Sequence, residues 1–202
     1  MRARRLLVIA LVVAAAASVV ARRSLPVSRR VPRVQPPLAA KLPARLPVGA
    51  PRVALVRKAD RVLGLYLDGR LAGAYPIALG PRPKGHKQRE GDGRTPEGDY
   101  YVCTRNPSSS FHLFLGLSYP NARDAAAGRR AGLITGQQYR AITSAIATHR
   151  QPPWDTPLGG EIGIHGDGSS PDWTLGCIAQ ENEHIEALWG MLKVGDPVVI
   201  EP

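Results

Sequence analysis

Cysteine is scarce in this sequence, which contains only Cys103 and Cys177 among 202 residues. Two cysteines cannot form the disulfide framework of a small secreted scaffold, although one bridge between them is permitted. The chain also lacks the close cysteine and histidine pairs of a structural zinc site and the Gly-Lys-Ser/Thr ending of a Walker loop. We therefore expect no metal and no cofactor, and a fold that depends on its hydrophobic core.

Aromatic and acidic residues are also few. Aromatic residues make up 5% of the chain, and 16 acidic residues face 27 basic ones, for a formal net charge of +11. This excess favours partners that carry phosphates or carboxylates. Nucleic-acid platforms interleave basic residues with aromatic ones on which bases stack, and no such run occurs here. We expect no nucleic-acid partner, which leaves lipid headgroups and acidic polymers.

Long apolar runs are absent except at the N-terminus. Residues 6–21 are apolar apart from Ser18, and arginines stand at positions 2, 4 and 5. The run is shorter than the ~20 residues of a membrane-spanning helix, and the small residues at its end suit a signal peptidase. We expect residues 1–21 to be a secretion signal, with an uncleaved membrane anchor as the alternative. The protein is then exported to the periplasm or cell envelope, and it contacts the membrane only through this segment, if the segment stays uncleaved.

Residues 22–51 are rich in proline and arginine. Such a stretch cannot build a core and is typical of an extended, semi-rigid spacer. Cleavage after Ala21 leaves 24 basic and 16 acidic side chains, a net charge of +8, so the mature chain stays basic. We expect residues 52–202 to form one folded domain.

The domain begins with patterns typical of β-strands. Val53 and Leu55 are expected to share one face of a first strand, and leucines occupy every second position from Leu63 to Leu67. Asp68-Gly69 is a two-residue hairpin turn, after which the chain returns. Further strands are expected at residues 71–79, 99–105, 111–117, 161–165 and 197–200.

Helical patterns interrupt the strands. Residues 121–150 are alanine-rich and predict two helices, the second of them starting at Thr135 with Gln138 at capping-box spacing. We expect this pair to be an insertion over the sheet. Asn182 is expected to cap a last helix, since apolar residues recur after it at helical intervals. The predicted fold class is mainly β with packed helices.

The chemistry is expected at His165 and Cys177. In the strand pattern Ile162-Gly-Ile-His-Gly, Gly163 and His165 lie on the face opposite the two isoleucines. A loop of nine residues then leads from Gly166 to Gly176 and Cys177, which lets the histidine and the cysteine meet.

This pair suits nucleophilic catalysis. A free thiol has a pKa of ~8.5, and a neighbouring imidazole raises its thiolate fraction, takes its proton and returns it to a departing amine. The backbone N–H groups of Gly176 and Cys177 are candidates for an oxyanion site, and a backbone carbonyl is the expected partner that orients His165. The alternative is that His165 is a hydrogen-bonded strand residue and Cys177 a small buried one.

Several separated motifs together resemble one family. His165-Gly is followed by Thr174-x-Gly-Cys-Ile, and upstream lies the stretch GHKQREGDGRTPEG at residues 85–98. From about Arg52 to Pro202 the chain resembles the L,D-transpeptidase catalytic domain (YkuD-like), in particular the branch found in bacteria with an outer membrane.

This resemblance implies a β-sandwich-like fold with the cysteine in a cleft. It implies a peptidoglycan L,D-transpeptidase in which a thiolate attacks the amide after the L-centre of meso-diaminopimelate, and an amine resolves the thioester. Cys177 then matches the nucleophile, His165 the base, Gly176 the oxyanion region and Thr174 the usual serine or threonine. Peptidoglycan stem peptides are the implied partners.

One departure from the family leaves the reaction open. Many members carry arginine two places after the cysteine, whereas this chain has Ala179. The branch with Cys-Ile-Ala includes hydrolases that release an attached outer-membrane lipoprotein, so hydrolysis is an alternative to transfer. A non-catalytic wall-binding module is the alternative from another class.

Other residues are candidates for binding substrate. His86 and Lys87 lie in the charged stretch before Gly98 and are suited to contact substrate carboxylates. Tyr119 ends a strand near the expected cleft, although its position favours a packing role. We expect Thr174, His86, Lys87 and Tyr119 to bind substrate.

Overall fold

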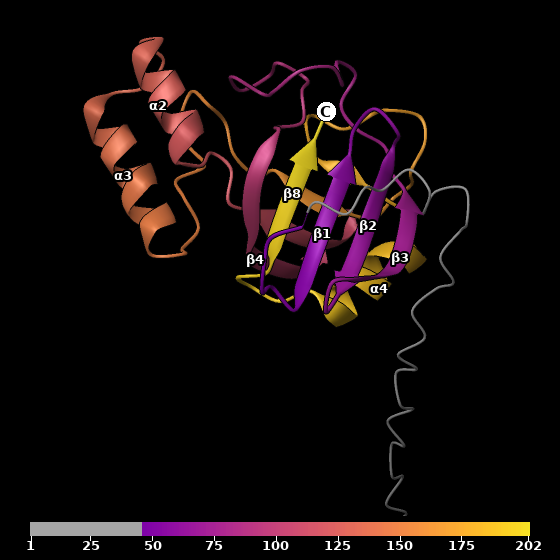
Figure 1. The fold of residues 1–202 in the computed structure, drawn as a ribbon. Helices are drawn as coiled ribbons and strands as arrows, with labels where there is room; N and C mark the ends of the chain where they lie inside the picture. The colour runs from indigo at the N-terminus through magenta and orange to yellow at the C-terminus, as the bar shows by residue number, and fades with distance from the viewer. Residues whose placement is uncertain (1–45) are drawn as a thin grey trace, which may run out of the picture.

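The computed structural model describes residues 46–202, so the predicted signal or anchor and residues 22–45 of the predicted spacer lie outside the described part. Within residues 46–202, eight strands form one sheet in the order β3-β2-β1-β8-β4-β5-β6-β7, and three helices accompany it (Figure 1). The elements are β1 (Arg52–Arg57), β2 (Val62–Leu67), β3 (Arg70–Pro76), β4 (Gly98–Ser109), β5 (His112–Leu117), α2 (Ala122–Arg130), α3 (Gly136–Ala147), β6 (Gly163–His165), β7 (Ile178–Ala179), α4 (Asn182–Met191) and β8 (Pro197–Glu201).

The first hairpin forms as its turn residues predict. Asp68 and Gly69 both have positive φ angles, 48° and 74°, which a type I′ turn requires. β2 and β3 then pair antiparallel on either side of this turn, and β1 pairs with β2. Leu63 and Leu65 of β2 are fully buried, as their alternation predicts.

The sheet bends along its longest strand. β4 pairs with β8 through residues 98–101 and with β5 through residues 102–109, so it belongs to both halves of the sheet. The curled sheet encloses a core to which both halves contribute, for example Leu63 and Ile164. α4 closes this core with Ile185 and Leu188 (Figure 1). The mainly β fold with few helices is confirmed.

The helix pair α2/α3 forms where predicted but lies elsewhere. Thr135 and Gln138 form the expected capping box, and Asn121 and Asp124 form another at the start of α2. The two helices pack on each other and stand beside the sheet, beyond β4, rather than over it (Figure 1). They have a small core of their own, and it consists of Ala125, Ile134, Ile142 and Leu158.

The predicted cap of α4 is wrong by one residue. Glu181 is the N-cap and makes no side-chain capping bond, whereas Asn182 is the first residue of the helix. The Asn182 side chain accepts a hydrogen bond from the Asp167 N–H instead, which ties the helix to the loop after His165. None of the helices in residues 46–202 combines the length and apolar character needed to cross a membrane.

Candidate active site

His165 is the last residue of β6, a short strand between β5 and β7. Its ring is nearly inaccessible, with 2% of the residue exposed. The Nδ1 atom lies 2.8 Å from the carbonyl oxygen of Gly166, which can only accept, so Nδ1 carries the proton. The Nε2 atom is therefore the unprotonated nitrogen, as a base requires.

Two aromatic side chains cover this imidazole. The Phe111 ring centroid lies 4.7 Å from that of His165, and the Trp173 centroid lies 5.4 Å away at a steep angle. Both aromatic residues are themselves partly exposed, so they form the outer wall over the histidine. Burial lowers the pKa of His165 below its ordinary value, which keeps the ring neutral near pH 7.

Cys177 follows a turn that only glycine can make. Gly176 has a φ of 135°, and a Cβ there would stand 2.7 Å from the backbone oxygen of Arg94. Thr174 holds the turn: its Oγ1 donates to the Cys177 carbonyl at 2.8 Å and accepts from the Gly176 N–H at 3.2 Å. The structure thus places Thr174 beside the cysteine, where it shapes the loop.

The thiol of Cys177 is turned toward a backbone carbonyl. Sγ lies 3.3 Å from the oxygen of Glu161, and within residues 46–202 no hydrogen bond joins it to His165. Burial raises the pKa of Cys177 to about 11, although the Gly163 N–H and the charge of Lys87 oppose the increase. The expected gain in thiolate is therefore absent from the resting site, which holds a neutral thiol and a neutral imidazole.

Two cavities open onto this pair. The first has a volume of about 460 Å³ and includes Lys87 and Thr174, and the second has a volume of about 430 Å³. Glu161 is the one charged residue that lines the second cavity, whose hydroxyls and amides come mainly from residues 104–110 and Gln151. Four residues border both cavities: Phe111, Glu161, His165 and Cys177.

Lys87 brings a positive charge to the first cavity. Its side chain is 3% exposed, and Nζ donates to the carbonyl of Arg89 at 3.1 Å and to Asp92 at 3.0 Å. An ammonium group has three N–H donors, so one remains after these two bonds. Lys58, by contrast, donates all three of its N–H groups to oxygens, those of Gly85, Thr95 and Glu97.

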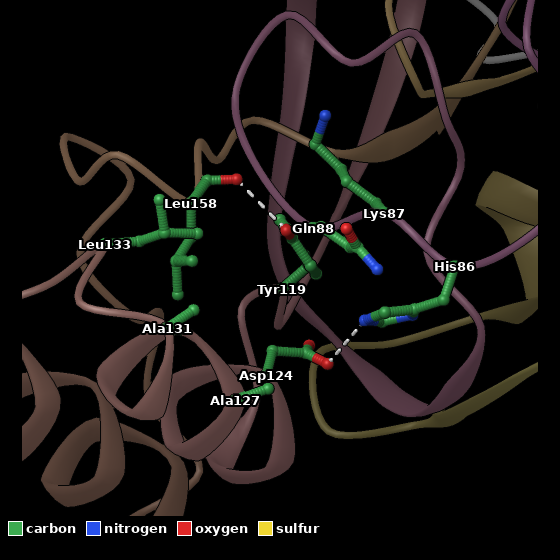
Figure 2. Close-up of a pocket in the computed structure, with 10 residues that line it drawn as sticks. His86, Lys87, Gln88, Tyr119, Asp124, Ala127, Ala131, Leu133 and Leu158 are labelled. Carbon is green, nitrogen blue, oxygen red and sulfur yellow. Dashed lines mark hydrogen bonds and ion pairs between the residues drawn. The ribbon is translucent and has the colours of Figure 1, made fainter.

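His86 and Tyr119 lie in a separate pocket of about 220 Å³ beside α2 (Figure 2). His86 Nε2 is 3.1 Å from Asp124 Oδ1, and the fully buried Tyr119 donates its hydroxyl to the Leu158 carbonyl at 3.0 Å. Lys87 borders this pocket as well as the first cavity. Neither His86 nor Tyr119 borders the two cavities at Cys177, so their role in substrate binding stays a prediction.

Three features of the site were not foreseen from the sequence. Phe111 comes from the β4–β5 turn and Trp173 from the loop between β6 and β7, and no sequence pattern places either ring against His165. Asp172 binds Arg61 with a shortest distance of 2.6 Å, which ties the cysteine loop to the β1–β2 turn. The one sequence signal for this aromatic cover was Trp173, because it stands next to Thr174 of the cysteine motif. The disulfide that the sequence permits does not form, since Cys103 and Cys177 are both free.

A cysteine and a buried neutral histidine at the junction of two cavities have the composition that nucleophilic acyl transfer requires. The sequence profile of one family, described as the L,D-transpeptidase catalytic domain (YkuD), matches residues 51–200. The chain belongs to this family.

The chain is also similar to individual proteins and solved structures. The Escherichia coli K12 protein YafK, described as a "Putative L,D-transpeptidase", is 28% identical over 163 residues, which cover 75% of this chain and 53% of YafK. The crystal structure of the helical cell shape determining protein Pgp2 from Campylobacter jejuni is 27% identical with a TM-score of 0.51, and the match covers 74% of this chain and 47% of that one. An L,D-transpeptidase from Xylanimonas cellulosilytica is 17% identical with a TM-score of 0.47, over 83% of this chain and 68% of that one. The chain spans about half the length of YafK and Pgp2.

Proposed function

We propose that this protein is an exported, cysteine-dependent peptidoglycan L,D-transpeptidase that acts on stem peptides containing meso-diaminopimelate. The observation that carries the proposal is that Cys177 and His165 border the same two cavities, and that the Gly166 carbonyl holds the Nδ1–H of His165 so that Nε2 is free to accept a proton. Membership of the L,D-transpeptidase family supports the substrate. The predicted signal at residues 1–21 supports a periplasmic location.

The first half-reaction forms a thioester. Sγ of Cys177 attacks the carbonyl carbon of the amide between diaminopimelate and D-alanine, while the thiol proton passes to Nε2 of His165. The C–N bond then breaks, and His165 returns the proton to the leaving amine of D-alanine. Because the resting thiol is neutral, proton transfer accompanies the attack instead of preceding it.

The second half-reaction resolves the thioester. An amine acceptor attacks the same carbonyl and loses a proton to His165, the S–C bond breaks, and the sulfur takes up the proton. In both halves the substrate oxygen becomes negative, and the N–H of Cys177 is the donor we assign to it. The N–H of Gly176 already lies 3.2 Å from Thr174 Oγ1, so it must be shared if it contributes as well.

Lys87 is the residue we assign to the substrate's carboxylate. It borders the cavity that contains Cys177, and one of its three N–H donors is not taken up by Arg89 or Asp92. A charge-assisted hydrogen bond from a buried ammonium is strong because little water competes for it.

Hydrolysis is a second candidate, and Ala179 favours it. This residue pairs with His165 across the sheet, bridges to Ala78 and is fully buried. The position where many family members carry arginine therefore offers no cation here. With water as the acceptor, the same thioester gives an amidase that trims cross-links or releases an attached outer-membrane lipoprotein.

Product masses separate these reactions. The full-length protein is incubated with a disaccharide-tetrapeptide, with and without an amine acceptor, and a Cys177→Ala variant serves as the control. We expect loss of D-alanine and a cross-linked or amine-exchanged product that the variant does not form. If the donor loses D-alanine and gains only a free carboxylate, with no amine attached, the protein is a hydrolase.

The same assay tests the candidate from another class, a non-catalytic wall-binding module. If the wild-type protein leaves the tetrapeptide unchanged and the Cys177→Ala variant keeps its full effect in cells, the catalytic proposal is wrong.

A further inference from the structure

Positive charge in the folded domain is concentrated on the α2/α3 hairpin, which comprises residues 121–150. Residues 46–202 contain 17 basic and 16 acidic side chains, a net formal charge of +1. The hairpin contains five arginines and one aspartate, a net of +4, so the remainder of the domain carries −3. The hairpin is therefore a basic element on a domain that is otherwise slightly acidic.

The arginines of the hairpin are exposed, and no acidic side chain within residues 46–202 forms an ion pair with them. They are Arg123, Arg129, Arg130, Arg140 and Arg150. The single acidic residue, Asp124, is buried and already engaged by His86 and by the hydroxyl of Tyr100. The positive charge of this surface is thus available to a partner.

Two of these arginines converge at the start of α3. A Cβ on Gly136 would stand 3.5 Å from Nη1 of Arg140 and 4.0 Å from Nε of Arg129, so both guanidinium groups lie around the same point. Two like charges repel each other, and an anion bound between them offsets this repulsion. This arrangement therefore favours an anionic group at the junction of the two helices.

We propose that the α2/α3 hairpin is a docking surface for the carboxylate-bearing peptides of the peptidoglycan polymer. Guanidinium groups bind carboxylates in a bidentate manner, and several of them on one element suit a polymer that repeats this group. The hairpin stands beside the sheet (Figure 1), and none of its residues borders the two cavities at Cys177, so it can hold polymer while those cavities hold a stem peptide. Attachment at a second site raises the effective concentration of substrate at the first. The choice of polymer rests on the proposed function.

A lipid bilayer fits this surface less well. Helices that lie in a membrane interface present large apolar side chains beside their basic ones. None of the exposed large hydrophobic residues within the described part of the chain is on the hairpin; they are Val48, Phe111, Trp173, Leu175 and Val194. The hairpin has the charge for an anionic surface but not the apolar anchors for a bilayer.

Co-sedimentation with isolated peptidoglycan sacculi tests the proposal. All proteins carry Cys177→Ala so that binding is measured without turnover. The double variant Arg129→Gln/Arg140→Gln is compared with Arg70→Gln/Lys193→Gln, which removes two exposed positive charges elsewhere on the domain. We expect the hairpin variant to bind roughly tenfold more weakly, the control variant to bind like the parent, and binding to fall with added salt.

Three outcomes would overturn the proposal: equal binding by the two double variants, equal binding to glycan strands stripped of their peptides, or hairpin-dependent binding to phosphatidylglycerol vesicles and not to sacculi. Circular dichroism spectra check that both variants are folded. Binding is measured without catalysis, so a failure of the proposed reaction leaves this result intact. Conversely, if the enzyme is active but the hairpin substitutions do not change its binding to sacculi, the docking surface is wrong and the proposed reaction is not affected.

Discussion

At the level of single residues, the ionisation of Cys177 decides when the nucleophile is reactive. Burial raises its pKa to about 11, so only a very small fraction is thiolate near pH 7. Because thiolate is the reacting form, the rate of alkylation by iodoacetamide should rise about tenfold per pH unit from pH 7 to 9 without reaching a plateau. Peptide-level mass spectrometry measures this rate at Cys177 separately from Cys103. A plateau below pH 9 would show that the thiol is activated at rest.

Lys87 gives a second prediction at this scale. Replacing it by methionine, Lys87→Met, removes the one buried cation that borders the Cys177 cavity in residues 46–202. A lost charge-assisted hydrogen bond costs about 1.5–3 kcal/mol, so we expect KM for the tetrapeptide donor to rise roughly ten- to a hundredfold.

The matched control is Lys84→Met, an exposed lysine three residues earlier in the same loop. It should leave KM unchanged. If both lysine variants have the wild-type KM, Lys87 does not bind the donor. Alkylation of Cys177 should also slow in Lys87→Met alone, because the charge that lowers the pKa of the thiol is gone.

At the level of elements, the loop from β6 to β7 sets the position of the cysteine. Gly176 and Gly168 both have positive φ angles, but only a Cβ on Gly176 would meet backbone, the oxygen of Arg94 at 2.7 Å. We expect Gly168→Ala to cost about 1 kcal/mol of unfolding free energy and Gly176→Ala about 2–3 kcal/mol, with loss of activity only in the latter. Urea denaturation measures both. Equal costs would mean that the close approach to Arg94 is not maintained in solution.

The elements also show what can be predicted from the sequence. The β2–β3 turn and the capping box at Thr135 were predicted correctly because their signals lie within four residues. The location of α2/α3 beside the sheet was not predicted, because a helix pattern shows which face is apolar but not which element packs against that face. The cap of α4 was missed because Asn182 bonds to the loop at Asp167, a contact made only in the folded chain.

The candidate site divides in the same way. His165 and Cys177 are close in the sequence and part of one motif, and the expected backbone partner of the imidazole is the carbonyl of Gly166. The aromatic cover from Phe111 depends on how far the β4–β5 hairpin reaches over β6, which no local pattern encodes. The raised pKa of Cys177 likewise follows from burial, and burial is a property of the whole fold.

At the level of the whole molecule, one ion pair joins two segments that are far apart in the sequence. Arg61, at the β1–β2 turn, binds Asp172 in the cysteine loop, and Asp172 also accepts the N–H of Leu79 at 2.9 Å. Burial alone would raise the pKa of Asp172, but the bonds from Arg61 and Leu79 outweigh it and hold this pKa below its ordinary value. The carboxylate is therefore bound more tightly to the fold than its protonated form is.

A lowered pKa in the folded state fixes the sign of the pH dependence. Asp172 stabilises the fold above about pH 5, and its contribution is lost as the pH falls through ~3.9 and then through the lower folded value. The variant Asp172→Asn should lose about 1 kcal/mol of unfolding free energy at pH 7, and the difference from wild type should shrink by pH 3. Urea denaturation at both pH values measures this, with Asp155→Asn, an exposed carboxylate outside any ion pair in residues 46–202, as the control. A difference that persists at pH 3 would mean that packing of the cysteine loop, rather than the charge of Asp172, joins it to the β1–β2 turn.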